Sequence, residues 1–573
     1  MTDQSVKLRK RVISTFSLNG FTIEERACAY LVSQLEPLPN DRERDAWLDK
    51  IVDYIQSSSH NNTSTLVDFE LLVKALKFCC DSEVLNANDT LSVKDCIQQY
   101  NYRYRYCPVK KKFFKESTND GSQLSLFGDA RAKIRQFVDR YTIVKQQMFR
   151  VHAATANTSS KDNGGSQTIG DRLRDVDYLL SSGGAVKGRS MKSSSSLENI
   201  ILLGIITQLK EGRYYIEDPT GAIQLDLTDT DFHKGYFTEN CCVLAEGVYD
   251  EINCVFKVAD MALPPGESAE ISRIYFGDCS DEIFTKSNST TLKAYEEKNK
   301  RMIIFVSDIH LDNMKVLGKF KTLLRGFNDH SPAAIVMTGD YLSASSVPGS
   351  QYAIQLQQHF TELAEWITAN CPRICRDTTF VILPGPNDRH CANILPKLAL
   401  PEFLTQRFSQ LLPKTVFTTN PTHMRYCTQR MCIVRADLIT KTLRNALNIK
   451  LQKKSASVDT SIENVATNYV KTLKSQSHLV SLPADVCPVY WTRAQSLSLY
   501  PMPDLVCVAD SDAPPFCVNN DDNSQRSSPG CVYINPSSFS KRQYTFIVYM
   551  TAERRADESQ IPPDSVDTDM ELQ

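Results

Sequence analysis

Three short apolar runs between residues 303 and 388 constrain the fold of this chain most strongly. The first run ends in Asp308-Ile309-His310, the second in Gly339-Asp340, and the third in Gly385-Pro386-Asn387-Asp388. Runs that are apolar throughout are typical of parallel strands that are buried on both faces. Because parallel strands bring their carboxyl ends to one edge of a sheet, we expect the three polar tips to lie together.

The size and charge of the chain limit what the rest can be. At 573 residues it is too long for one hydrophobic core, so we expect several domains. A net charge of -2 gives no overall attraction to nucleic acid or to an anionic membrane, so any such contact has to be local. No apolar run approaches the roughly 20 residues of a membrane span, and the basic start, Met1 to Arg11, does not predict a secretory signal.

The 18 cysteines contain no Cys-x-x-Cys pair. The nearest pairs that could act as ligands are Cys371 with Cys375 and Cys427 with Cys432, and neither has the usual spacing of a zinc site. Reduced thiols, as in the cytosol or nucleus, are therefore favoured over zinc ligands.

The first 200 residues divide into three predicted parts. Residues 1–78 show helical periodicity with polar breaks, which predicts four short helices that form either a structural cap or a docking module on a tether. Residues 79–150 form a connecting segment that ends in a helix over 125–150. Residues 151–197 are rich in Ser and Gly, which predicts a disordered linker with one short docked piece near 175–180.

Within the connecting segment, aromatic and basic residues alternate from Tyr100 to Lys115. Such interleaving is typical of surfaces that bind single-stranded nucleic acid. The same tyrosines have high strand propensity, so docking on a neighbouring domain is the alternative.

Residues 198–290 predict an OB-fold, because five short strands follow one another with a tight turn at Asp218-Pro219-Thr220-Gly221. Tyr214, Tyr215 and Phe237 could stack bases. Acidic side chains outnumber cations around them, however, and such a surface repels phosphate. A barrel that docks on protein is therefore favoured.

Residues 291–551 carry the three strand tips and resemble the calcineurin-like metallophosphoesterases, on the strength of Asp308-Ile309-His310 and Gly339-Asp340. That family uses carboxylate, amide and imidazole ligands to hold two metal ions that activate water. The resemblance implies that Asp308 and His310 would hold one metal and that Asp340 would bridge both.

The remaining part of the family pattern is missing. Pro386 and Asn387 stand where the family has its ligand Asn and its catalytic His, and proline offers no ligand. The strand that ends at Asp510 lacks the expected Gly-His-x-His, and no histidine follows His478. We therefore expect no catalytic residue, cofactor or bound metal, with Asp308, His310 and Asp340 as vestigial ligand positions.

Three further residues remain open as ligands. His423 is the best candidate for the lone histidine of the family, His390 follows the third strand, and Asp388 would complete a one-metal site. Surface or hydrogen-bonding roles are favoured for both histidines.

The order of the parts resembles the B subunits of eukaryotic replicative DNA polymerases, most of all the epsilon type. Five segments carry this resemblance: Ser125 to Arg131, Gln208 to Gly212, Tyr215 to Gly221, Leu383 to Asp388 and Tyr500 to Asp504. It implies a multidomain α+β protein with an N-terminal helical bundle, an OB-fold and an inactive phosphoesterase-like α/β sandwich. An acidic tail, expected to be disordered, covers 552–573.

The resemblance also implies a function. It describes a non-catalytic scaffold subunit in the nucleus that holds the C-terminal part of the catalytic subunit of DNA polymerase epsilon. Residues 1–78 would bind the GINS part of the replicative helicase, any DNA contact would be made through the complex, and no membrane is involved. The alternatives are a divergent metal-dependent phosphodiesterase or nuclease, and a single-stranded DNA binder that uses Tyr100 to Lys115 and the barrel.

Overall fold

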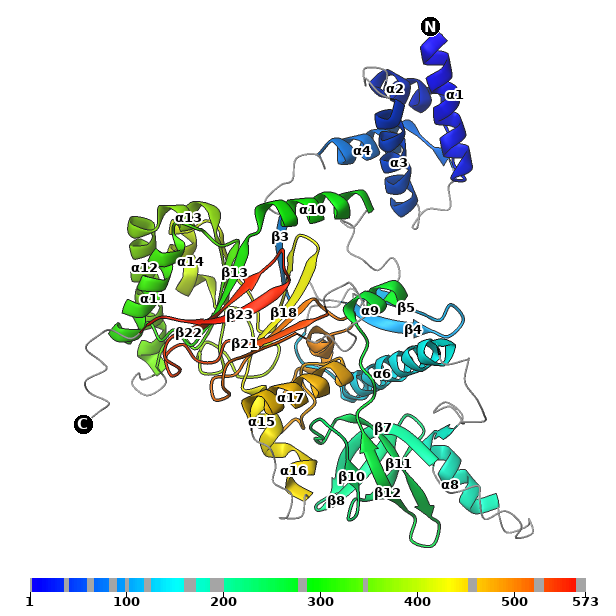
Figure 1. Ribbon diagram of the computed structural model, residues 1–573, viewed down its shortest axis with the longest axis vertical. Helices are drawn as coiled ribbons and strands as arrows, with labels where there is room; N and C mark the ends of the chain where they lie inside the picture. The colour runs from blue at the N-terminus through cyan, green and yellow to red at the C-terminus, as the bar shows by residue number, and fades with distance from the viewer. Residues whose placement is uncertain are drawn as a thin grey trace. The chain divides into compact units, whose positions relative to one another are not determined.

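The computed structural model describes residues 3–35, 41–58, 66–81, 90–97, 102–117, 125–158, 172–185, 200–276, 286–343, 349–451, 461–519 and 530–562 (Figure 1). The chain forms two compact units. The first contains Met1–Ser92, Asp278–Asn299 and Tyr426–Thr428, and the second contains Val93–Gly277, Lys300–Arg425 and Gln429–Gln573. Among the described residues, no helix combines the length and the apolar character that crossing a bilayer requires.

The first unit is built mainly from helices. These are α1 (Asp3–Leu18), α2 (Glu25–Leu35), α3 (Asp41–Ser58), α4 (Phe69–Asp81) and α10 (Lys286–Asn299), with the short parallel pair β1 (Thr22–Ile23) and β2 (Leu66–Val67). Helices α1 to α4 share one core, to which they contribute Phe16, Leu31, Ile51 and Leu72. The helical periodicity of residues 1–78 predicts these four helices.

The second unit contains a closed barrel. Its strands are β7 (Ile200–Lys210), β8 (Arg213–Asp218), β9 (Gly221–Asp226), β10 (Asp231–Phe232), β11 (Cys242–Asp250) and β12 (Val255–Ala262). They follow the order β10-β12-β11-β7-β8-β9, and a parallel pairing of β12 with β9 closes the barrel. Phe237 is fully buried in the barrel core, so the hypothesis that it stacks bases is wrong.

Elements of the connecting segment and of the predicted linker pack against this barrel. Helix α6 (Ala130–Thr158) extends beyond the expected end at 150, and its Val144 and Met148 cover β7. Strand β6 (Leu173–Arg174) pairs with β7, and α8 (Val176–Ala185) begins where Asp218 accepts a hydrogen bond from the Val176 N–H at 2.8 Å. Residues 159–171 and 186–197 of the linker lie outside the described residues.

Residues 291–551, predicted to form the phosphoesterase-like part, contribute to two six-stranded sheets. The first has the order β16-β15-β14-β13-β22-β23 and the second β20-β21-β19-β18-β17-β3. Their strands are β3 (Leu91–Asp95), β13 (Met302–Ser307), β14 (Ala334–Thr338), β15 (Thr379–Leu383), β16 (Thr415–Phe417), β17 (Thr422–Tyr426), β18 (Gln429–Arg435), β19 (Leu505–Ala509), β20 (Phe516–Asn519), β21 (Val532–Asn535), β22 (Thr545–Met550) and β23 (Arg555–Gln560).

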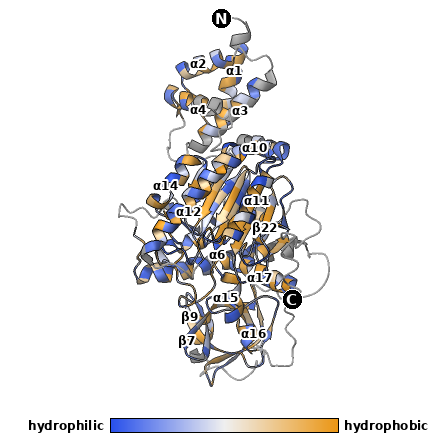
Figure 2. Ribbon diagram, turned by 90° about the vertical axis from the view of Figure 1, so that its left-hand side faces the viewer, coloured by the Kyte–Doolittle hydropathy of each residue, from blue (hydrophilic) through white to orange (hydrophobic). Residues whose placement is uncertain are grey.

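Helices cover the outer face of each sheet. The first sheet is covered by α11 (Met314–Phe327), α12 (Gly349–Asn370), α13 (Pro372–Asp377) and α14 (Glu402–Leu411). The second is covered mainly by α15 (Leu438–Asn445) and α17 (Ile462–Gln476). The second unit also contains α9 (Ala269–Phe276), α16 (Leu447–Leu451) and the 3-10 helix η3 (Trp491–Leu497). In Figure 2 the central strands are largely orange, whereas α11 and α12 carry both colours, as expected for helices that bury only one face.

Side-chain alternation divides each strand between an outer and an inner face. Ile304 and Val306 of β13 pack under α11 and α12, and Cys432 and Val434 of β18 pack in the core of the second sheet. The intervening residues of each strand therefore point to the opposite face. Arg435 follows the buried residues Met431 and Ile433 at steps of two along β18, so all three side chains point to the inner face, between the two sheets.

Amide side chains join the barrel to the second sheet. Gln476 of α17 accepts a hydrogen bond from the Cys242 N–H at 2.7 Å and donates to the Cys242 carbonyl at 2.8 Å. Asn448 donates to the Gly235 carbonyl, and Leu447 enters the barrel core. The barrel and the phosphoesterase-like part therefore share a bonded interface.

The expectation of a disordered tail over 552–573 is wrong for its first part. The acidic segment from 552 does not begin as a tail, because β23 pairs antiparallel with β22 along Thr545–Met550. Its charged residues suit an edge strand, which sequence composition alone does not distinguish from disorder. Residues 563–573 lie outside the described residues.

The segment with alternating aromatic and basic residues forms a β-hairpin of β4 (Tyr102–Cys107) and β5 (Lys112–Ser117). Phe113 is buried and lies 5.1 Å from the Tyr500 ring, centroid to centroid. One face of the hairpin is therefore docked, as the second interpretation expects.

Candidate functional site

The polar tips of the three parallel strands meet at one sheet edge. β13, β14 and β15 pair in parallel, and each passes directly into its tip. The Asp340 N–H donates to Asp308 Oδ1 at 2.8 Å, while the backbone N–H and the side-chain amide of Asn387 donate to the two oxygens of Asp340 at 2.8 and 2.7 Å. The convergence predicted from the apolar runs is therefore found.

Two glycines allow this close approach of backbones. A Cβ atom on Gly339 would lie 2.5 Å from the Gly385 N atom, and one on Gly385 would lie 2.5 Å from the Gly339 carbonyl carbon. Both distances are shorter than side-chain carbons tolerate, so only glycine fits at either position.

Asp388 is wholly occupied by structural donors. Its carboxylate accepts from the N–H groups of Gly385 at 2.7 Å and Tyr341 at 3.2 Å, and from the Tyr352 hydroxyl at 2.8 Å. Burial raises the pKa of this carboxyl, although these donors oppose the rise. The residue that could have completed a one-metal site instead fixes the loop after β15.

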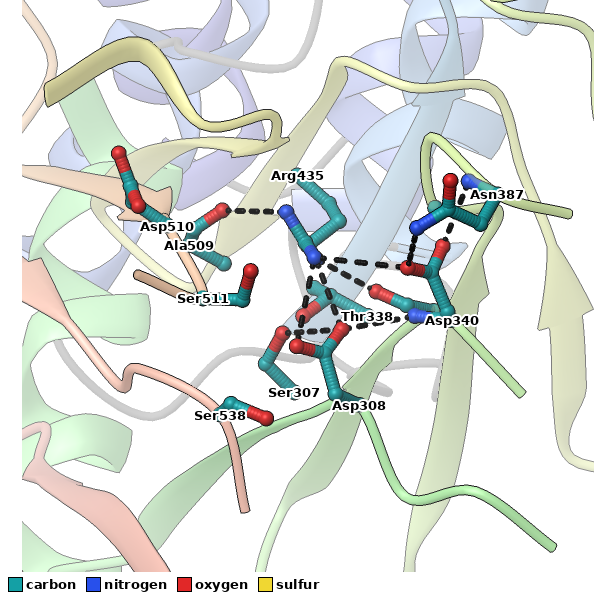
Figure 3. A network of polar contacts seen from close by, with 12 residues as sticks. Ser307, Asp308, Thr338, Asp340, Asn387, Arg435, Ala509, Asp510, Ser511 and Ser538 are labelled. Atoms are coloured by element: carbon teal, nitrogen blue, oxygen red, sulfur yellow. Dashed lines mark hydrogen bonds and ion pairs between the residues drawn. The ribbon is translucent and has the colours of Figure 1, made fainter. Parts of the chain in front are cut away.

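The group that faces the carboxylates of Asp308 and Asp340 is the guanidinium of Arg435, at the end of β18 (Figure 3). Its Nε donates to Asp308 Oδ1 at 2.9 Å and to the Gly339 carbonyl at 2.7 Å, and an η nitrogen lies 3.6 Å from Asp340 Oδ2. The other η nitrogen donates to Asp437 at 2.8 Å and to the Ala509 carbonyl at 3.3 Å. The side chain is only 1% exposed.

The pKa shifts agree with a tightly paired cluster. Burial lowers the pKa of Arg435, but Asp308, Asp340 and Asp437 outweigh that effect, so the net shift is upward and the guanidinium stays charged. Burial raises the pKa of Asp340 to about 6, against the opposing charge of Arg435. The cluster therefore holds one permanent cation among several carboxylates.

Lys397 closes the opposite side of the loop after β15. Its buried ammonium donates to the carbonyls of Gly385 at 2.7 Å, Pro386 at 3.2 Å and Asp388 at 2.7 Å. Burial lowers its pKa, and the carboxylates of Asp388 and Asp340 oppose that shift. The loop that carries a ligand in the phosphoesterase pattern is thus held from both sides by cations.

The expected histidines do not join the cluster. His310 is half-buried, and its carbonyl accepts the Asn313 N–H at 3.0 Å. His423 in β17 bonds the Ser496 carbonyl at 2.9 Å, and burial lowers its pKa to about 4. His390 bonds the Leu398 carbonyl at 2.8 Å. Across the described ranges, no group of three or more His, Cys, Asp or Glu side chains is arranged to hold a metal ion.

Asp510 follows β19, where the family would have its terminal histidine motif. Its carboxylate bonds the start of a helix. It accepts from the Thr440 N–H at 2.9 Å and its hydroxyl at 3.1 Å, inside the first turn of α15. A carboxylate near a helix N-terminus is stabilised by the helix dipole.

Sequence reasoning missed Arg435 and Lys397. A cation directly after the apolar run Met431 to Val434 was the available signal for Arg435, because a charged residue rarely ends buried without a partner. Lys397, by contrast, lies in an irregular segment with no pattern that indicates burial.

Three family models match separate parts of this chain. Residues 303–518 match the B subunit of DNA polymerases alpha and epsilon, residues 130–265 match the OB-fold domain of DNA polymerase epsilon subunit 2-like proteins, and residues 4–79 match the N-terminal domain of DNA polymerases epsilon. The barrel and the two-sheet part thus define a polymerase B subunit of the alpha/epsilon class.

Comparison with whole proteins narrows this class. DNA polymerase epsilon subunit 2 of Mus musculus is 34% identical over 567 residues, which cover 97% of this chain and 99% of the mouse protein. The human protein of that name is 33% identical over 565 residues, with the same coverage. The Drosophila melanogaster protein of that name is 32% identical over 563 residues, which cover 97% of this chain and 98% of its own length. The chain belongs to the DNA polymerase epsilon subunit 2 family.

Proposed function

We propose that this chain is a non-catalytic scaffold subunit of DNA polymerase epsilon in chromosomal DNA replication. The observation that carries the proposal is Arg435, whose guanidinium occupies the position between Asp308 and Asp340 where the phosphoesterase pattern has metal. A fixed cation that bonds these carboxylates repels a divalent ion from the same oxygens. It also supplies no open coordination position at which water could be activated.

The neighbouring substitutions support loss of the hydrolytic chemistry. Pro386 offers no side-chain ligand, and Asn387 directs its backbone N–H and its side-chain amide to Asp340 instead of facing a leaving group. Asp308 and His310 keep left-handed backbone conformations, with φ values of 54° and 42°. Such conformations are concentrated at active sites, which fits an edge descended from one.

The proposal assigns partners to the two units. The barrel and the phosphoesterase-like part bind the C-terminal part of the catalytic subunit, and residues 1–78 bind the GINS part of the replicative helicase. Support comes from the names of the relatives and from the separate core of helices α1 to α4, which gives that segment a folded surface of its own. The complex, and with it this chain, works in the nucleus.

Co-expression tests the scaffold role. We expect the full chain to co-purify with the C-terminal part of the catalytic subunit, and a variant that lacks residues 1–78 to do the same but to lose capture of GINS. A full chain that stays a monodisperse monomer when mixed with that part of the catalytic subunit would contradict the proposal.

The absence of hydrolysis is tested separately. We expect no stoichiometric metal by mass spectrometry after incubation with manganese, and no cleavage of bis-p-nitrophenyl phosphate. Bound metal with activity that disappears in Asp340→Ala would instead establish the alternative, a divergent phosphodiesterase or nuclease.

A further inference from the structure

The β4–β5 hairpin presents two chemically different faces. Residues that pair directly across an antiparallel ladder point to the same side, so Tyr106 and Phe113 share one face, and Arg105 and Phe114 share the other. On the first face Phe113 is buried against Tyr500 and Tyr106, at ring centroid distances of 5.1 and 5.2 Å. The second face, with Arg105 and Phe114, is exposed.

Positive charge is concentrated on the exposed part of this hairpin. Residues 102–117 contain six cationic side chains and one carboxylate, in a chain whose net charge is -2. Glu116 is engaged by Arg103 at 2.7 Å and lies 3.6 Å from Arg105. The remaining charge is centred on the exposed tip, Pro108 to Lys112, where no described carboxylate forms an ion pair with Lys110, Lys111 or Lys112.

An exposed aromatic ring lies beside this cationic tip. Phe114 is 39% exposed, and the Lys110 ammonium lies 5.1 Å from its ring centroid. Exposed rings beside lysines are what single strands use, since a base stacks on the ring while the phosphates on either side meet cations. An acidic peptide would use the lysines but would gain little from the ring.

The hairpin is held rigidly enough to act as a binding surface. Arg150 of α6 lies 6.0 Å from the Phe113 ring centroid and 5.8 Å from that of Tyr500, and its guanidinium pairs with the buried Glu267 at 2.7 and 2.9 Å. The docked face is therefore tied to the body of the second unit, and the tip projects from a fixed base.

We propose that the exposed face and tip of the β4–β5 hairpin, centred on Lys110, Lys111, Lys112 and Phe114, bind the backbone and a base of single-stranded nucleic acid. This contact is separate from the proposed binding of the catalytic subunit, which does not depend on it.

The test measures binding of fluorescein-labelled dT20 to the full chain by anisotropy, between about 25 and about 200 mM salt. Replacing Lys110, Lys111 and Lys112 together by alanine should weaken binding at least about a hundredfold at about 25 mM salt. It should also reduce the slope of log K against log salt by about 2, since each phosphate contact with a single strand contributes ~0.7. Phe114→Ala should weaken binding at least about fivefold with an unchanged slope, because it removes stacking and no charge.

A matched control carries alanine at three exposed lysines elsewhere in the second unit, Lys234, Lys315 and Lys414, and changes the net charge equally. We expect this control to bind dT20 like the unchanged chain. Equal losses in the control and the tip variant would overturn the proposal, as would no binding of dT20 at the lowest salt concentration. Equal competition by polyglutamate, with no effect of Phe114→Ala, would overturn it in favour of an acidic protein partner.

Co-purification with the catalytic subunit is measured on the same variants. A tip variant that still co-purifies with the catalytic subunit but no longer binds dT20 supports the proposal that the hairpin binds a single strand. Failure of the scaffold proposal would appear in the unchanged chain, so the two results are distinguishable.

Discussion

Replacement of Arg435 by methionine should destabilise the phosphoesterase-like part severely. The side chain is 1% exposed, and its loss leaves the carboxylate of Asp308 buried without its cation and the carbonyls of Gly339 and Ala509 without this donor. Removing one partner of a buried ion pair typically costs about 3–5 kcal/mol in the free energy of unfolding. Methionine keeps much of the side-chain volume, so little of this loss comes from an empty cavity.

Urea unfolding followed by tryptophan fluorescence measures the effect. Trp366 packs against the core of the first sheet, whereas Trp47 lies in the first unit, so a Trp47→Phe background restricts the signal to the second unit. With a slope of ~3 kcal/mol per M, this loss should lower the midpoint by about 1 to 1.7 M. The midpoint of Arg435→Lys should lie between those of the unchanged chain and of Arg435→Met, because lysine keeps the charge but not the forked geometry.

Two further measurements identify the cause of the loss. Adding Asp308→Asn to Arg435→Met removes the uncompensated charge, so the double variant should be more stable than the sum of the single losses predicts. The single Arg435→Met variant should also lose more stability at about pH 8 than at about pH 5, where Asp340 is protonated once Arg435 no longer lowers its pKa. A midpoint within about 0.3 M of the unchanged chain at the higher pH would refute the reasoning.

Three other perturbations have expected outcomes. The pKa of Asp340 is raised to about 6 from 3.8, so its stabilising effect is complete below the unfolded pKa and is lost as the pH rises through 6. The stability of the unchanged chain relative to Asp340→Asn should therefore fall by about 2.4 kcal/mol between about pH 4 and about pH 7, measured by urea titrations at each pH. Phe113→Ala should release the hairpin at a cost of about 3–5 kcal/mol and expose it to trypsin at the lysines of its tip, with Phe114→Ala as the control that leaves the docked face intact. Lys397→Met should cost at least about 1–3 kcal/mol, because it leaves the carbonyls of Gly385 and Asp388 without their donor, and an unchanged thermal midpoint would show that water replaces it.

The part of the site that can be predicted from sequence is the part formed by consecutive residues. Each strand tip follows its apolar run directly, so the meeting of Asp308, Asp340 and Asn387 follows from parallel pairing alone. The barrel strands are also predictable, since their alternation and the turn at Asp218 to Gly221 are local signals.

The partner of the carboxylates is not a local feature. Arg435 lies 127 residues from Asp308 in the chain and belongs to the other sheet, so only the packing of two sheets brings them together. Strand β23 was missed for a different reason, because an edge strand is solvated on one side and its charges resemble those of a disordered tail.

The geometry around Arg435 gives the carboxylates of Asp308 and Asp340 a structural role that needs no metal. Asp308 and Asp340 come from the first sheet, whereas Asp437 and the Ala509 carbonyl come from the ends of strands in the second, so one guanidinium joins both sheets at their shared edge. Because a buried carboxylate without a cation is costly, each acid depends on the arginine and the arginine on the acids. The cluster is therefore constrained by stability alone, without any need for hydrolysis. Under the proposed function, a rigid connection between the two sheets is what a platform for another protein chain requires.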